Sequence, residues 1–365
     1  MRIASGAEAL LDLSQSIVRE SSCPQPEKLL KLLDEGIRSL SSESVDARPH
    51  ASSGEPGGIV WVSTPLVAIV PDLHARTALL SDLLASFLPS RPHSRIIDLI
   101  LNGHLTLICL GDVFNTEGKL GAERWTRAAR KIESMPGAEG VLSGEMEEEM
   151  GASLATLCLV ITLKRELAGG FHCLKGNHDN GTNTNLDGDS AFFKFALEGA
   201  MGAEWLRLRY GEETMRTLRR YERLLPLVAA GNSFCASHAE PAFALSIEDL
   251  IEYRTRPDIV RALIWTDNGK AEDGSVRESL SSILGPAVAE ESGFWLSGHR
   301  PVAGTHRLRA KGRLVQIHNA ERRQIAWIDN DPRAPKGLID LYEIGDRKKE
   351  LSLLETVALF SSVPS

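Results

Sequence analysis

Polar residues that can hold a metal ion or transfer a proton follow five short apolar runs of this 365-residue sequence. Their side chains are carboxylates, imidazoles and one amide, a mixture of oxygen and nitrogen donors that suits borderline divalent ions such as Mn, Fe or Zn. The candidate ligands, in chain order, are Asp72, His74, Asp112, Asn177, His238 and His299. One such run would carry little weight, but five in one chain predict a metal centre.

The spacing of these residues indicates what a metal centre could do here. Asp72 and His74 are separated by one residue, so on an extended strand their side chains face the same way and can hold one ion together. A carboxylate has two oxygens and can bridge two ions. Two ions ~3.5–4 Å apart can hold a hydroxide and stabilise in-line displacement at phosphorus. An alkoxide leaving group would also require a general acid nearby.

The elements that position these residues alternate along the chain. Short runs rich in Val, Ile, Leu, Phe or Cys, typical of strands, are separated by helix-like stretches. This alternation predicts an α/β fold with a largely buried sheet, in which ligands bind at the carboxyl ends of the strands. The predicted strands lie at 59–63, 66–70, 105–110, 171–175, 233–237 and 294–297, and helices between them at 78–87, 122–134 and 190–210.

The chain divides into three predicted parts. Residues 1–58 carry two helix-like stretches and then a linker or mobile loop rich in Ser, Pro and Gly. Residues 59–345 form the predicted catalytic domain, with an insertion at about 119–170, and residues 346–365 form a C-terminal tail. The insertion contains an acidic run at 144–150, which we expect to form the solvent-exposed start of a helix.

Composition excludes several classes of protein. With 42% hydrophobic and 25% charged residues, the chain is neither disordered nor fibrous. The 41 Lys and Arg residues are outnumbered by 49 Asp and Glu residues, for a formal charge of −8. This balance argues against general nucleic-acid binding, which rests on clustered basic residues.

Localisation is inferred from the cysteines and the apolar runs. The five cysteines show no CxxC spacing, which favours a reduced cytosol over a disulfide framework. The N-terminus lacks the features of a signal peptide. The longest uncharged apolar run, 152–163, is too short for a ~20-residue membrane span. We therefore expect a cytoplasmic protein without a membrane span.

The order of the motifs over roughly residues 66–331 resembles that of the calcineurin-like metallophosphoesterases. Their pattern runs D-x-H, G-D-x-x-D-R-G, G-N-H-[DE] and then two further histidines, and the strongest match is KGNHD at Lys175–Asp179. Three features resemble the phosphoprotein-phosphatase branch. These are LIWTDN at Leu263–Asn268, a single GH at 298–299, and the segment 313–329, which looks like that branch's closing hairpin. The resemblance implies a central pair of packed β-sheets flanked by helices.

Carried over position by position, the resemblance implies a site for two divalent ions. The implied ligands are Asp72, His74 and Asp112 for the first ion, and Asp112, Asn177, His238 and His299 for the second, with Asp112 bridging both. His178 would contact the phosphate and protonate the leaving oxygen. The substrate would be a phosphorylated protein or small molecule.

The second motif departs from the family pattern. Asn115 stands where the family has the Asp that orients the catalytic histidine, and Thr116 stands where it has a phosphate-binding Arg. An amide stabilises an imidazolium less than a carboxylate does, so we expect His178 to be a weaker acid–base group unless Glu117 substitutes. The phosphate must then be bound by other residues, and the candidates are Asn115, Arg277, Arg300, Arg124 and Lys175.

Two classes of function remain open. The first is a dinuclear metal-dependent phosphoesterase acting on a phosphate monoester, with a phosphodiester or a dinucleoside polyphosphate as the alternative substrate. The second is a binding or scaffold protein that keeps the fold with little turnover, which the altered second motif suggests. Every implied ligand is present, and we therefore favour the enzyme. His318 is interpreted as a strand histidine near the site and not as a ligand.

Overall fold

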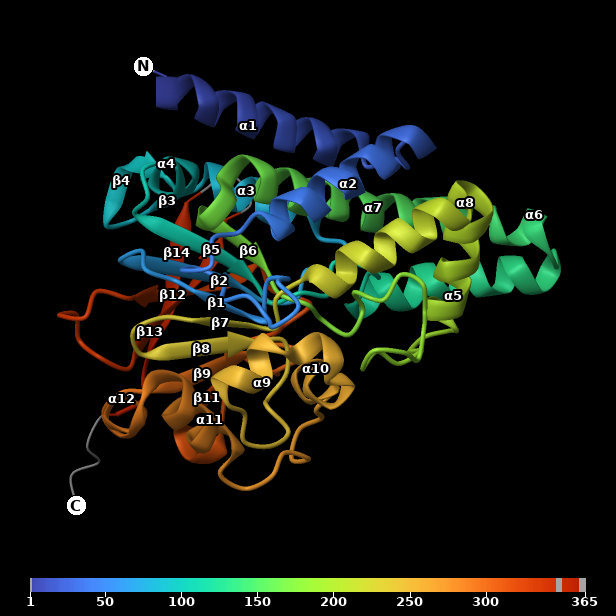
Figure 1. Ribbon diagram of the computed structural model, residues 1–365. Coiled ribbons are helices and arrows are strands. Elements are labelled where there is room, and N and C mark those ends of the chain that lie inside the picture. Colours follow the sequence, from blue (N-terminus) through green and yellow to red (C-terminus); the bar gives the residue numbers. More distant parts are fainter. Residues whose placement is uncertain (1, 346–349, 361–365) are drawn as a thin grey trace.

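Two six-stranded β-sheets lie face to face, and helices cover the outer side of each sheet, in the computed structural model of this chain (Figure 1). The structure describes residues 2–345 and 350–360. The short apolar runs form the central strands and the stretches between them form helices. The expected α/β fold with two packed sheets between helices is therefore confirmed.

The first sheet contains the strands that precede the first three motifs. In order across the sheet, its strands are β14 (Leu351–Ala358), β13 (Leu338–Ile344), β12 (Gln324–Asp329), β2 (Leu66–Val70), β5 (Leu105–Cys109) and β6 (Phe171–Cys173). β2, β5 and β6 are parallel, whereas β12 pairs antiparallel with β2. Every residue of β2 is buried, and because side chains alternate between the two faces, Val67 and Ile69 face the second sheet while Leu66 and Val70 face the helices.

The second sheet contains the strands that precede the histidine motifs. Its order is β1 (Ile59–Trp61), β7 (Val228–Ala230), β8 (Phe234–Ser237), β9 (Phe294–Ser297), β11 (Leu314–Gln316) and β10 (Arg307–Arg309). β8, β9 and β11 are parallel to one another. A short separate hairpin joins β3 (Phe87–Leu88) to β4 (Arg91–Arg95).

The helices form the two outer layers. Those on the side of the first sheet are α1 (Arg2–Glu20), α2 (Pro26–Ser41), α3 (Thr77–Ala85), α4 (Ile96–Leu101), α5 (Gly118–Ser134), α6 (Ala138–Val141), α7 (Gly144–Leu167) and α8 (Glu198–Leu224) (Figure 1). Those on the side of the second sheet are α9 (Ile247–Ile251), α10 (Pro257–Ile264), α11 (Ser275–Leu284) and α12 (Pro286–Glu291). Three 3₁₀ turns lie at Ala168–Gly170, Tyr253–Thr255 and Ala310–Gly312. No helix among the described residues is both long and apolar enough to cross a membrane.

The N-terminal residues are packed onto the body of the protein. Leu10 of α1 and Leu33 of α2 belong to the same hydrophobic core as β2 and β5. In the segment 41–58, where we expected a linker or mobile loop, the buried Arg48 guanidinium donates hydrogen bonds to the carbonyls of Gly57 and Leu224. The Leu224 bond holds this segment to the end of α8, and the backbone N–H of Trp61 in β1 donates to the Ala47 carbonyl, which holds it to the sheet.

Three other segments differ from expectation. The segment 313–329 does not form a hairpin, because β11 pairs with β9 in the second sheet and β12 pairs with β2 in the first. The helix expected at 190–210 begins only at Glu198, whose carboxylate accepts the backbone N–H of Lys194 at 2.8 Å and so stabilises the preceding loop. Within the expected tail, Leu351–Ala358 forms the edge strand β14, while 346–349 and 361–365 lie outside the described residues.

Candidate metal centre and active site

Six loops, each following a parallel strand of one sheet or the other, bring their polar residues together. Three of them follow β2, β5 and β6 in the first sheet, and three follow β8, β9 and β11 in the second. All six residues proposed as metal ligands are buried within this cluster. The sixth loop carries His318, which lies at the site with them.

Asp72, His74 and His318 form one group of potential ligands. One ligand atom from each lies within 4.8 Å of the other two, and all three residues are buried. Glu117 adds a fourth donor, because its Oε2 lies 3.2 Å from His74 Nε2. The same oxygen accepts a hydrogen bond from His318 Nε2 at 2.6 Å, which leaves His318 Nδ1, 3.6 Å from Asp72 Oδ2, as the ligand atom of that ring. Two ligands ~2.1 Å from one ion and at right angles to each other lie about 3 Å apart, so the separation between Glu117 and His74 fits a shared ion.

Asp112 lies between this group and a second one. Its Oδ2 is 3.5 Å from His74 Nε2 and also 3.5 Å from His238 Nε2. Beyond it, Asn177 Oδ1 lies 2.8 Å from His238 Nε2 and 3.0 Å from His299 Nδ1. The structure thus brings together every residue that the resemblance implies as a ligand, with Asp112 between the two groups.

Buried polar atoms without partners show that this donor set suits a cation. Among the described residues, Asp72 Oδ1, His299 Nε2 and His318 Nδ1 are buried and have no hydrogen-bond partner. Unsatisfied buried polar atoms are costly, and a bound ion would satisfy them. The imidazoles are also oriented for ligation: His74 Nδ1 donates to the Asn115 carbonyl and His238 Nδ1 donates to the Leu110 carbonyl, which leaves each Nε2 facing the cluster.

The electrostatics of the cluster lead to the same conclusion. Burial raises the pKa of Asp72 to about 6 and, together with the Asp72 and Asp179 carboxylates, raises the pKa of Asp112 well above its usual range. Burial lowers the pKa of His74 to about 4 and that of His238 to about 3, so both imidazoles are neutral near pH 7. Neutral imidazole is the form that binds metals, and a cation would favour ionised carboxylates.

The backbone of these loops is held in uncommon conformations. His74, Asp112, Asn115 and His299 all have positive φ, between 44° and 67°. Such residues are sparse outside glycine and concentrate at functional sites. The Asp179 carboxylate stabilises this arrangement by accepting backbone N–H groups from both the second and the third motif, including that of Asp112 at 2.9 Å.

His178 lies beside the metal ligands and contacts Asn115. Its Nδ1 is 3.3 Å from Asn115 Oδ1, an amide oxygen that can only accept, so the Nδ1 proton points to Asn115 and leaves Nε2 available. Its backbone N–H donates to Asp112 Oδ1 at 2.7 Å. Burial, together with the neighbouring His74, lowers the pKa of His178 well below its ordinary value. Asn115 therefore orients the ring but supplies no charge for the imidazolium.

Glu117 contacts the metal-ligand histidines and does not replace the missing carboxylate beside His178. Although burial opposes its ionisation, the nearby His74 and His318 hold the pKa of Glu117 well below the usual range. Sequence reasoning assigned neither Glu117 nor His318 to the metal site. The position of His318 in the sequence could have indicated that it lies at the site, because His318 follows the end of β11 by two residues, as Asp72 follows the end of β2.

Only some of the cationic candidates for phosphate binding reach the site. Arg300 lines the same pocket as His178, whereas Arg277 lines a separate pocket of about 700 Å³. Lys175 is buried and donates to the Asp179 carbonyl at 2.6 Å, and Arg124 pairs with Glu148. Lys194, which sequence analysis did not single out, lines the His178 pocket and forms an ion pair with Glu117.

The pocket over the cluster has a volume of about 220 Å³ and partly aromatic walls. The Phe192 ring lies 4.2 Å from the His178 ring, centroid to centroid, and Trp265 and Phe193 complete the apolar side. Phe193 is 75% exposed at the surface. The pocket therefore has polar and charged residues at its base and an apolar side formed by aromatic rings.

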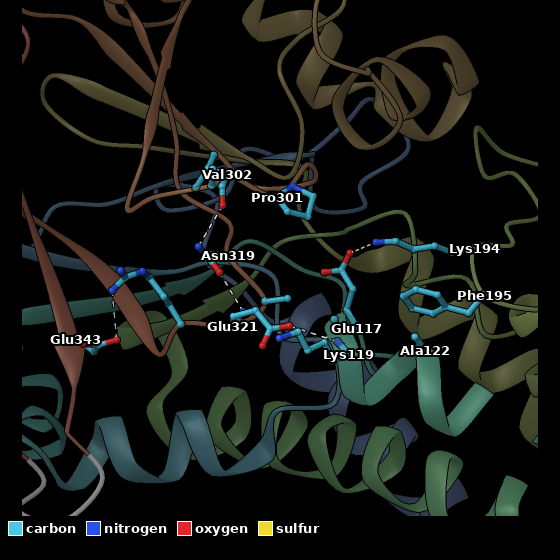
Figure 2. A pocket seen from close by; sticks show the side chains of 14 residues that line it. Glu117, Lys119, Ala122, Lys194, Phe195, Pro301, Val302, Asn319, Glu321 and Glu343 are labelled. Carbon is cyan, nitrogen blue, oxygen red and sulfur yellow. Dashed lines mark hydrogen bonds and ion pairs between the residues drawn. The ribbon is translucent and has the colours of Figure 1, made fainter. Parts of the chain in front are cut away.

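A second and larger hollow adjoins this pocket and shares two residues with it. Its volume is about 780 Å³, and Glu117 and Lys194 belong to both lining sets. Figure 2 shows these two side chains joined by their ion pair, with Phe195 beside Lys194 and Asn319 across the hollow. The adjoining hollow provides room for a group much larger than phosphate next to the metal ligands.

The sequence matches no family model and no curated protein. Among solved structures, a protein serine/threonine phosphatase from Saccharomyces cerevisiae shares 12% identity at a TM-score of 0.51, over 93% of this chain and 91% of that chain. A cold-active protein tyrosine phosphatase shares 12% identity at a TM-score of 0.44, over 83% of this chain and 82% of that chain. A protein-tyrosine phosphatase of a psychrophilic Shewanella shares 13% identity at 0.41, over 82% of each chain. The likeness to the yeast enzyme shows a phosphoprotein-phosphatase-like fold.

Proposed function

We propose that this protein is a metal-dependent phosphoesterase that hydrolyses phosphate monoesters, with two divalent ions at the candidate centre. The observation that carries this proposal is the position of Asp112 Oδ2, equidistant from His74 Nε2 and His238 Nε2. A carboxylate so placed, with further ligands on both sides, suits a pair of ions. The phosphatase-like fold supports the same reaction class.

The ligands divide into two sets around Asp112. Asp72, His74, His318 and Glu117 would hold the first ion, and Asn177, His238 and His299 the second. Bound divalent ions would supply charge neutralisation for the phosphoryl group and an activated water for in-line attack. Mn, Fe and Zn all suit a mixed set of carboxylate, amide and imidazole donors.

The remaining roles belong to His178, Lys194 and Arg300. Lys194 and Arg300 line the pocket and would bind the phosphoryl oxygens in place of the absent motif arginine. His178 would protonate the leaving oxygen. Although its pKa is low in the free protein, a bound phosphate dianion raises the pKa of a nearby imidazole because opposite charge favours the protonated form.

A monoester is the favoured substrate because two cationic side chains flank a small pocket beside the metal ligands. The aromatic walls and the adjoining hollow accept the organic part of the ester. Both a phosphorylated protein segment and a small phosphorylated metabolite fit this description. A phosphodiester or a dinucleoside polyphosphate is the alternative substrate.

The proposal is tested by assaying the purified protein with Mn²⁺ on an aryl phosphate monoester, an aryl diester and a dinucleoside polyphosphate. Asp112→Asn and a chelated sample should lose turnover, and His178→Asn should lose most of it while retaining metal. His93→Asn is the matched control, since His93 is an exposed histidine on β4 outside the pocket. Bound metal without turnover of any ester would overturn the proposal and favour a low-activity scaffold with this fold.

A further inference from the structure

Five arginines surround a pocket beside the C-terminal half of α8. The pocket has a volume of about 200 Å³ and is lined by Arg216, Arg219, Arg220, Arg223 and Arg254, together with Glu55 and Leu224. We call this the arginine pocket. It shares no lining residue with the candidate active site.

The spacing of these arginines is unfavourable for the helix itself. Four arginines share one face of α8, because Arg216 and Arg223 each lie three or four residues from both Arg219 and Arg220. Like charges at this spacing destabilise a helix. Glu212 and Glu213 precede them by one turn, but neither lines the pocket nor forms an ion pair with Arg216 among the described residues. The helix dipole favours a cation in the last turn, which accounts for Arg223 but not for the other three arginines on this face.

The arginine pocket keeps excess positive charge after its internal contacts are formed. Arg219 Nη2 lies 2.6 Å from Asp187 Oδ2, and the same oxygen lies 3.4 Å from Arg223 Nε. Arg254 Nε is 3.8 Å from Glu55 Oε2. Two carboxylates therefore face five guanidinium groups.

Unpartnered guanidinium groups remain available to a ligand. Arg216 and Arg220 are exposed and form no hydrogen bond or ion pair with the described residues. Arg254 donates to the carbonyls of Pro56 and Arg223, which fixes its position, yet its Nη2 is buried and has no hydrogen-bond partner among the described residues. Donors available to a ligand thus come from α8, and Arg254, held in place by its own contacts, adds a fixed positive charge on the other side of the pocket.

We propose that the arginine pocket binds a compact phosphorylated anion that carries at least two negative charges. A guanidinium group presents parallel N–H donors that match phosphate oxygens two at a time, and several arginines can share one phosphoryl or diphosphoryl group. Asp187 reaches Arg219 and Arg223 through a single oxygen and does not pair with Arg216 or Arg220. The small volume excludes a bulky ligand from the pocket itself. The chain carries a net charge of −8, so local attraction and not overall charge must hold the anion.

The test measures binding of methylenediphosphonate, whose P–C–P linkage resists hydrolysis, by calorimetry in the presence of a chelator. The chelator removes metal ions that would otherwise attract the probe to the candidate active site. The variant is Arg216→Gln with Arg220→Gln, two exposed side chains without partners among the described residues. The matched control is Arg19→Gln with Arg130→Gln, two exposed arginines that line neither pocket. Both double variants change the net charge equally.

We expect the pocket variant to bind at least tenfold more weakly than the wild type and the control variant to bind within twofold of it. Asp187→Asn should bind at least threefold more tightly, because it removes the carboxylate that competes for Arg219, and asparagine tolerates the positive φ of 60° at this position. Equal losses in the two double variants would show general charge attraction and overturn the proposal. Undetectable binding to the wild-type protein at millimolar probe would also overturn it.

Discussion

Replacing Asn115 by aspartate should convert His178 into a stronger general acid. Asn115 Oδ1 already lies 3.3 Å from His178 Nδ1, so the substitution places a carboxylate oxygen where the amide oxygen now accepts the ring proton. The backbone at residue 115 has a φ of 67°, a conformation that aspartate also adopts. The change therefore adds charge while preserving geometry.

The expected size of the effect follows from this distance. A unit charge ~4 Å away in an effective dielectric of ~20 contributes about 4 kcal/mol, which corresponds to about three pKa units. Shifts caused by one neighbouring charge are typically about 1–3 units. A general acid acts in its protonated form, so a raised pKa of His178 keeps that form to higher pH. The alkaline limb of the rate profile should move upward by about 1–3 pH units.

The assay compares pH profiles of kcat for an alkyl phosphate and a nitrophenyl phosphate. Only the alkoxide leaving group needs the proton, so the alkyl ester should show the shift and a higher rate near neutral pH, whereas the nitrophenyl ester should change little. Asn115→Leu should move the limb in the opposite direction. Asn102→Asp, which adds the same charge at an exposed helix end outside the pocket, should leave it in place. If Asn115→Asp kept its full metal content and its alkaline limb did not move, the proposed contact between residue 115 and His178 as general acid would be refuted.

Three further changes test the metal centre and the buried charges. Glu117→Gln should weaken binding of one ion by about 10–100-fold, measured by titrating metal into metal-free protein. Unchanged affinity for both ions would show that Glu117 is not a ligand. Gly298→Ala would place a methyl group 1.8 Å from Asp72 Oδ1. It should therefore lower the free energy of unfolding in urea by about 1–3 kcal/mol and release metal from the site. Wild-type values in both measurements would contradict this packing. Glu43→Gln leaves Lys164 buried without its carboxylate, 2.5 Å away, and should cost about 3–5 kcal/mol at pH 7. Although burial alone would raise it, the His172 hydrogen bond and the charges of Lys164 and Arg48 hold the pKa of Glu43 well below its ordinary 4.5. The difference in unfolding free energy should therefore be full above that pH and shrink as pH falls. A difference independent of pH would exclude the ion pair as its source.

Much of the candidate site could be predicted because its information is local. A strand such as β2 is recognised from a few apolar residues, and the expected ligands follow the end of their strand within four positions. The parallel direction of β2, β5 and β6 then places their loops at one edge of the sheet. Asp72, His74, Asp112 and Asn177 follow strands of this sheet, whereas His238 and His299 follow strands of the other sheet, and the family resemblance implied that they join the same site.

The missed residues depend on pairing that local patterns do not reveal. β11 and β12 are adjacent in sequence and both are apolar, so they resemble a hairpin, yet each joins a different sheet. Once β11 is parallel to β9, His318 falls at the same edge as His299. Lys194 reaches the pocket from a loop that Glu198 stabilises, a contact that the helical pattern of the sequence did not indicate.

The segment expected as an insertion at about 119–170 supports the altered second motif. Ser153 Oγ of α7 accepts the backbone N–H of Asn115 at 3.0 Å, and Glu149 Oε1 accepts that of Thr116 at 2.7 Å. Glu149 belongs to the acidic run that we expected to be solvated, but it is fully buried. A buried carboxylate requires such partners, and a loop with positive φ at Asn115 requires external support. The helix and the loop therefore stabilise each other, and the orientation of His178 depends on a helix that contributes no residue to the pocket.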